Sequence, residues 1–170
     1  MGSKDFVFPA KKIEQTLTFE LNELVSTFKL WLEERGYNVL ETKHIEKQGE
    51  DGRSLIKFSW GADKKVDPYV KQVIDIDFFA DVKNIIVDIE DQKKKLQEGT
   101  VSIEFSGYLK KDSEDDWTLK SSKGGGWTFL REFFDKFWNK DKMGKFESDL
   151  TKDINDVISD VKTYLKLHKF

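Results

Sequence analysis

The stretch "VKQVIDIDFFA", residues 70–80, decides the fold class of this chain. Its apolar and polar side chains alternate with a period of two, which is typical of a strand with one buried and one solvated face. We expect one face to carry Val70, Gln72, Ile74, Ile76, Phe78 and Ala80, and the other to carry Tyr69, Val73, Asp75, Asp77 and Phe79. The sequence therefore predicts a half-buried strand whose outer face bears carboxylates.

The same period of two extends through the middle of the chain, from Tyr37 to about Asp112, and a weaker alternation over residues 11–19 predicts a first strand. The segment "GEDG", residues 49–52, predicts a hairpin turn, and "DQKKKLQEG", residues 91–99, predicts a charged turn. Parallel neighbours need a crossover of about a dozen residues or more, and these connections are shorter. We therefore expect an antiparallel meander of about five to six strands.

Three segments have the period of a helix. Apolar residues from Leu17 to Leu32 share one helical face, and Gly36 follows where a left-handed cap is expected. A longer stripe runs from about Lys145 to Leu167 and comprises Phe146, Leu150, Ile154, Val157, Ile158, Val161 and Leu165. Residues 127–138 predict a short aromatic helix between them. The predicted fold is α+β, with the three helices packed on one face of the sheet.

The length of 170 residues fits a single domain. Within it we expect a strand-helix-meander core over residues 11–112, a polar glycine-rich linker over residues 113–126, and a helical C-terminal part over residues 127–170. We find no internal repeat.

The composition excludes several function classes. The chain has no cysteine, which rules out thiol catalysis and cysteine-ligated metals. Its net charge of -3 provides no broad basic field for a phosphate backbone, so we expect no nucleic-acid partner. No window approaches the ~18 uninterrupted apolar residues of a membrane span. We expect a cytoplasmic protein.

The candidates for catalysis and metal binding are few. Asp75 and Asp77 project from one sheet face and could hold a hard cation, but a solvated face balanced by lysines explains the same pattern. The two histidines, His44 and His168, do not suggest a paired catalytic set. We expect no catalytic residue and no cofactor, and a catalytic role for a tyrosine or buried carboxylate stays open.

Base stacking is the other reading of the outer sheet face. Trp60, Tyr69 and Tyr108 could stack on bases beside Lys57, Lys71 and Lys110. The acids of the same predicted face oppose it, because they repel a phosphate backbone.

The predicted helix 127–138 is the main candidate interaction surface. One half carries Trp127, Phe129, Leu130, Phe133, Phe134, Phe137 and Trp138, and the other half is polar. This apolar half is wider than the ~100° stripe that docking on a core requires. It fills a corner of the core, contacts a protein partner or a second copy, or contacts lipid. The polar half is nearly neutral, so we favour protein contact over an anionic membrane.

The order of elements resembles the helix-grip fold of START and Bet v 1-like proteins, in which a curved antiparallel sheet wraps a long C-terminal helix. The chain differs in having one early helix and an additional aromatic helix. The resemblance implies a carrier of an apolar small molecule, with Phe78, Phe105, Trp127, Phe134 and Ile158 as candidate lining. The lysine- and glutamate-rich composition is also similar to that of small uncharacterised archaeal α+β proteins, which implies no function.

The sequence thus indicates no specific activity. The main hypothesis is a non-enzymatic binding or interaction module that uses the aromatic helix, with a protein partner or self-association. The alternative hypothesis is a carrier of an apolar small molecule or lipid.

Overall fold

The computed structural model describes residues 3–111 and 139–167. The elements in chain order are β1 (Ser3–Phe19), α1 (Leu21–Glu34), β2 (Asn38–Gln48), η1 (Glu50–Gly52), β3 (Arg53–Asp67), β4 (Val70–Ile89), β5 (Gln92–Lys111) and α4 (Asn139–Leu167). The predicted linker 113–126 and the predicted aromatic helix 127–138 lie outside these residues. The α+β class with an antiparallel sheet is confirmed.

The five strands of the described residues form one antiparallel sheet in the order β1-β5-β4-β3-β2. The last strand therefore pairs with the first, and the meander continues from β5 back to β2 at the far edge. The register shifts in β1 between Phe6 and Lys11 and in β2 between Glu41 and Lys43. These bulges interrupt the two edge strands, which disfavours pairing with the sheet of another molecule.

The alternation in β4 places its side chains as the sequence predicts. Ile76 and Phe78 are buried, whereas Phe79 is 41% exposed and Asp77 is on the exposed side of the strand. We call the face of Ile76 the helix face and the face of Asp77 the outer face. Both sides of β5 follow the same rule, since Ile103 and Phe105 are on the helix face and Glu104 is exposed.

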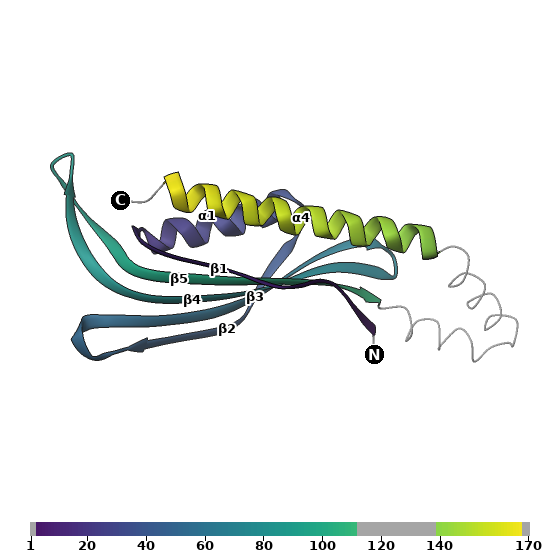
Figure 1. Cartoon of the computed structure of the whole chain (residues 1–170), viewed down its shortest axis with the longest axis horizontal. Coiled ribbons are helices and arrows are strands. Elements are labelled where there is room, and N and C mark those ends of the chain that lie inside the picture. The colour runs from purple at the N-terminus through teal and green to yellow at the C-terminus, as the bar shows by residue number, and fades with distance from the viewer. Residues whose placement is uncertain (1–2, 112–138, 168–170) are drawn as a thin grey trace, which may run out of the picture.

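Both helices lie side by side on the helix face of the sheet (Figure 1). The predicted stripe of α4 is confirmed, because Leu150, Ile154, Val157, Ile158, Val161 and Leu165 are all buried. These residues form one core with α1 and the four strands β1, β3, β4 and β5. Arg35 and Asp160 join the two helices through a 2.6 Å ion pair, and Trp31 and Tyr164 join them through an edge-to-face contact.

A polar network joins α4 to the sheet near Tyr37. The Tyr37 hydroxyl donates to Asp153 Oδ2 at 2.8 Å, and Lys64 Nζ lies 3.9 Å from the same oxygen. Gln72, which is buried, donates from Nε2 to the carbonyl oxygen of Phe146 at 3.0 Å. Buried polar groups are tolerated in a core when they are paired in this way.

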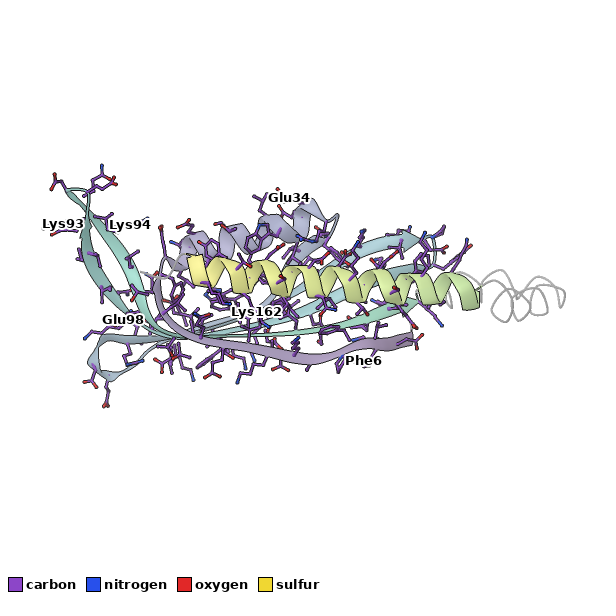
Figure 2. All side chains as sticks on the ribbon, turned by 45° about the horizontal axis from the view of Figure 1, so that its top comes forward. Phe6, Glu34, Lys93, Lys94, Glu98 and Lys162 are labelled. Atoms are coloured by element: carbon purple, nitrogen blue, oxygen red, sulfur yellow. The ribbon has the colours of Figure 1, made fainter. Side chains whose placement is uncertain are left out.

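The turn predicted at residues 91–99 is wrong. The connection is two residues long, Glu90 and Asp91, with φ of 50° and 64°, and β5 begins at Gln92. The lysines that follow belong to a strand because they pair with β4, as in Asp88 with Lys93 and Val87 with Lys94. Cross-strand pairing outweighs the weak strand propensity of lysine. The β4–β5 hairpin consequently extends beyond the helices, with Lys93 and Lys94 near its tip (Figure 2).

Three element boundaries also differ from the sequence prediction. The first strand begins at Ser3 rather than residue 11, because β1 pairs with β5 along almost its whole length. Leu17 belongs to β1, so the first helix begins at Leu21, and the last helix begins at Asn139 rather than about Lys145. Gly36 ends α1 with a φ of 89°, as predicted.

Candidate functional site: a groove between α1 and the β2–β3 pair

A groove of about 550 Å³ opens between α1 and strands β2 and β3 on the helix face. Its apolar lining comprises Leu21, Val25, Val39, Ile56, Phe58 and Trp60. Helix α4 packs mainly on β5 and β1, and α1 packs on β2. The groove therefore lies in the half of the helix face that α4 does not cover.

Stacked aromatic rings form the floor of the groove. The Phe58 and Phe78 rings stack with centroids 4.4 Å apart, and Phe58 lies 5.2 Å from Trp60. Trp60 also stacks on Phe28 of α1 at 5.6 Å. Such ring pairs are rigid and well packed, so the floor is preformed.

The rim on the β2 side is polar. It consists of Glu41, His44 and Glu46, whose side chains are each about half exposed. In a regular strand, Glu41 and His44 would point to opposite faces. The register shift between Glu41 and Lys43 inserts one extra residue, Thr42, and this bulge turns both side chains toward the groove.

Hydrogen bonding and stacking hold the His44 ring in place. Its Nδ1 lies 2.8 Å from Glu41 Oε1, and its Nε2 lies 4.0 Å from Glu46 Oε2. The ring also stacks on Phe58 with an interplanar angle of 17°. The rim thus presents an oriented imidazole between two carboxylates.

The opposite wall contributes one cation. Lys29 of α1 lines the groove, and its Nζ lies 3.9 Å from Glu33 Oε1, one turn along the helix. Its charge is therefore balanced on α1. Among the residues that the structure describes, the charged groups lining the groove are two carboxylates on β2 and this paired lysine.

The structure places Asp75 and Asp77 on the outer face, away from the groove. Ser59 Oγ donates to Asp77 Oδ1 at 2.6 Å. Partial burial raises the pKa of Asp75, an effect that Lys4 opposes and Asp77 reinforces. Within residues 3–111 and 139–167, no group of three or more His, Cys, Asp or Glu side chains is placed to hold a metal ion.

The aromatic residues considered for base stacking do not share a face. Trp60 is buried on the helix face, whereas Tyr108 is on the outer face, where Lys4 lies 4.9 Å over its ring and Phe6 lies beside it. Phe6 itself is 74% exposed and points away from the helices (Figure 2). A single stacking surface built from Trp60 and Tyr108 is therefore wrong.

The other predicted site residues have two outcomes. Phe105 and Ile158 are buried in the core and do not line the groove, and Phe78 is the buried cross-strand neighbour on which the Phe58 ring stacks. The aromatic-helix candidates Trp127, Phe129, Leu130, Phe133, Phe134, Phe137 and Trp138 lie outside the described residues, as does His168.

The sequence matches no protein-family model and no curated protein. In the described part of the chain, no helix is long and apolar enough to cross a membrane.

Sequence reasoning missed the rim because its three residues come together through a bulge. The spacing of Glu41, His44 and Glu46 shows no common face under a period of two. The one available signal was the presence of a histidine between two glutamates in a strand that carries few apolar residues. That pattern is also common on solvated edge strands.

Proposed function

We propose that this protein is a non-catalytic binding protein whose groove between α1 and the β2–β3 pair takes a small molecule with an apolar body. The observation that carries the proposal is the lining: apolar side chains of α1 and β2 and a stacked aromatic floor lie beside the polar rim of β2 and the polar residues Asn22, Ser26 and Lys29 of α1. A few polar groups at the edge of an apolar hollow of several hundred Å³ are typical of small-molecule sites.

The arrangement of the elements supports this proposal. The long C-terminal helix lies against the sheet, and the first strand pairs with the last. The resemblance to helix-grip proteins implies the same class of function, a carrier of an apolar small molecule. The proposed binding groove differs from the cavity that the resemblance implies, because Phe105 and Ile158 are buried in the hydrophobic core and do not line the groove.

Titration with 1-octanol, followed by carbon-13 methyl NMR, tests the proposal. We expect saturable shift changes at the methyl groups of Val25 and Val39, which line opposite sides of the groove. In Ser26→Trp, an indole at an exposed lining position should fill the groove and abolish these changes.

The matched control is Leu30→Trp, which adds an indole at a position of α1 that is 52% exposed and does not line the groove. This variant should bind octanol as the wild type does. Absence of saturable changes in the wild type, or equal binding by Ser26→Trp, would contradict the proposal.

Protein contact through residues 127–138 remains a separate prediction of the sequence. The broad apolar half of this predicted helix favours contact with another protein. Size-exclusion chromatography with light scattering on wild type and on Phe133→Glu with Phe137→Glu tests it. Loss of self-association, or of a bound partner, by a folded variant is expected, whereas an unfolded variant would show that these residues belong to the core.

A further inference from the structure

We infer that the ligand of the groove is an amphipathic amine, whose ammonium group is held between His44 Nε2 and the Glu46 carboxylate. This inference rests on the proposed function, since it names the charge and the polar partner of the molecule that the groove would take.

The contact between His44 and Glu41 determines which ring nitrogen bears a hydrogen. Glu41 Oε1 lies 2.8 Å from Nδ1, and a carboxylate oxygen only accepts. Nδ1 therefore donates to Glu41. In the neutral ring, the second nitrogen, Nε2, is then an acceptor.

Two acceptors consequently face each other at the rim. His44 Nε2 and Glu46 Oε2 are 4.0 Å apart, too far for a direct hydrogen bond. A donor nitrogen at the ordinary distance of roughly 2.9 Å from each atom fits this separation. An ammonium group carries three donors, so it satisfies both acceptors and places its charge beside a carboxylate.

The charges around this position favour a cation over an anion. Glu41 and Glu46 are both at the β2 rim, and the cation that lines the other wall, Lys29, is paired with Glu33. An anionic head group would meet two carboxylates there. A neutral alcohol would gain a hydrogen bond but no charge interaction.

The position of the rim relative to the floor sets the shape of the ligand. Phe58 stacks directly on His44, and Trp60 continues the floor toward α1. A molecule whose head group is at His44 can therefore lay its apolar body along the half-buried side chains of Val25 and Val39, next to the buried ring of Phe58.

Three probes of equal chain length test the inference: octylammonium, 1-octanol and octanoate, each titrated at about pH 8, where an alkylamine is cationic and a carboxylate is anionic. We expect octylammonium to bind about tenfold or more tightly than octanol, because charge-assisted hydrogen bonds are roughly twice as strong as neutral ones. Octanoate should bind no better than octanol.

Two variants of the rim locate the head group. Glu46→Gln should reduce the preference for octylammonium over octanol to within about threefold, because the head group loses its carboxylate partner. His44→Phe keeps a ring on Phe58 but removes the acceptor, so it should also reduce the preference. The control Glu104→Gln makes the same charge change on the outer face and should retain the preference.

The outcomes separate the two proposals. If octanol and octylammonium bind the wild type equally, or octanoate binds best, the inference of an amine ligand is overturned, whereas the proposed small-molecule groove is supported. A preference that persists in both Glu46→Gln and His44→Phe also overturns it. If none of the three probes binds, the proposed function itself fails.

Discussion

Gly107 lies on β5 under α4, and among the described glycines it is the one that the side chains of α4 approach most closely. A Cβ at this position would overlap the Cδ1 atom of Ile154 and would lie 3.4 Å from both Leu150 Cδ2 and Phe8 Cβ. The missing side chain lets the α4 stripe reach the backbone of β5. Glycine is thus required here by close packing rather than by its backbone angles.

We predict that Gly107→Ala lowers the free energy of unfolding by about 1–3 kcal/mol, because the added methyl group displaces Ile154 from a filled core. Gly144 provides a matched control within α4, since nothing lies within 4 Å of its Cβ position. Gly144→Ala should stabilise the protein by roughly 0.5–1 kcal/mol through helix propensity. Urea unfolding measures both, and equal signs for the two variants would contradict the account.

Among the elements, the β4–β5 hairpin uses unfavourable residues in its turn. Glu90 and Asp91 both have positive φ, which side-chain-bearing residues adopt at a cost. Two-residue hairpin turns of this type favour Asn-Gly. We predict that Glu90→Asn with Asp91→Gly stabilises the protein by about 0.5–1 kcal/mol, measured by urea unfolding. A loss of stability would show that the two acids make interactions that offset their strain.

The same hairpin caps the start of α1. The Leu21 N–H donates to Gln97 Oε1 at 2.7 Å, and Gln97 Nε2 donates to Asn84 Oδ1 at 3.1 Å. The residue at the usual capping position, Glu20, makes no side-chain capping hydrogen bond. A side chain distant in sequence therefore supplies the acceptor.

We predict that Gln97→Ala costs about 1 kcal/mol and speeds hydrogen exchange in the first turn of α1, because it leaves the Leu21 N–H without its acceptor. Asn84→Ala removes only the contact between the two amides and should leave the exchange of Leu21 nearly unchanged. Equal effects of the two variants would place the stabilisation in the hairpin rather than in the cap.

At the scale of the whole molecule, two buried tyrosines make stability depend on pH. Burial raises the pKa of Tyr164 to about 12, and Glu23 adds to the shift. Burial and the hydrogen bond to Asp153 raise the pKa of Tyr37 further. Below about pH 10, the ordinary pKa of tyrosine, both hydroxyl groups stay protonated in the folded and in the unfolded chain. Above it, the unfolded chain releases protons that the folded chain retains, so the free energy of unfolding falls.

We predict that stability declines between about pH 10 and pH 12, with Tyr37 contributing up to about 1.4 kcal/mol per pH unit. Tyr37→Phe should be less stable than the wild type at neutral pH, because Asp153 loses a donor, and its stability should fall less steeply at high pH. Urea unfolding across this range checks both effects. If the free energy of unfolding falls with pH equally steeply in the wild type and in Tyr37→Phe, Tyr37 is not a source of the pH dependence.

Local patterns predicted the faces of the elements well. The alternation over residues 70–80 and the stripe from Leu150 to Leu165 both identify side chains that are buried in the structure. These patterns depend only on neighbours two, three or four residues apart, and so they are visible in one dimension. The caps and turns at Gly36 and residues 49–52 follow from local residue preferences in the same way.

Local patterns along the chain are therefore sufficient to predict the α+β class, the antiparallel meander and the buried side of α1, α4 and the central strands. Three features emerge only when the chain is folded: the lengths of β1 and β5, the pairing of β1 with β5, and the meeting of Glu41, His44 and Glu46 at one rim. Each of these depends on the register between strands that are distant in the chain. A one-residue bulge in that register reverses which side chains share a face, and periodicity within a single strand does not record it.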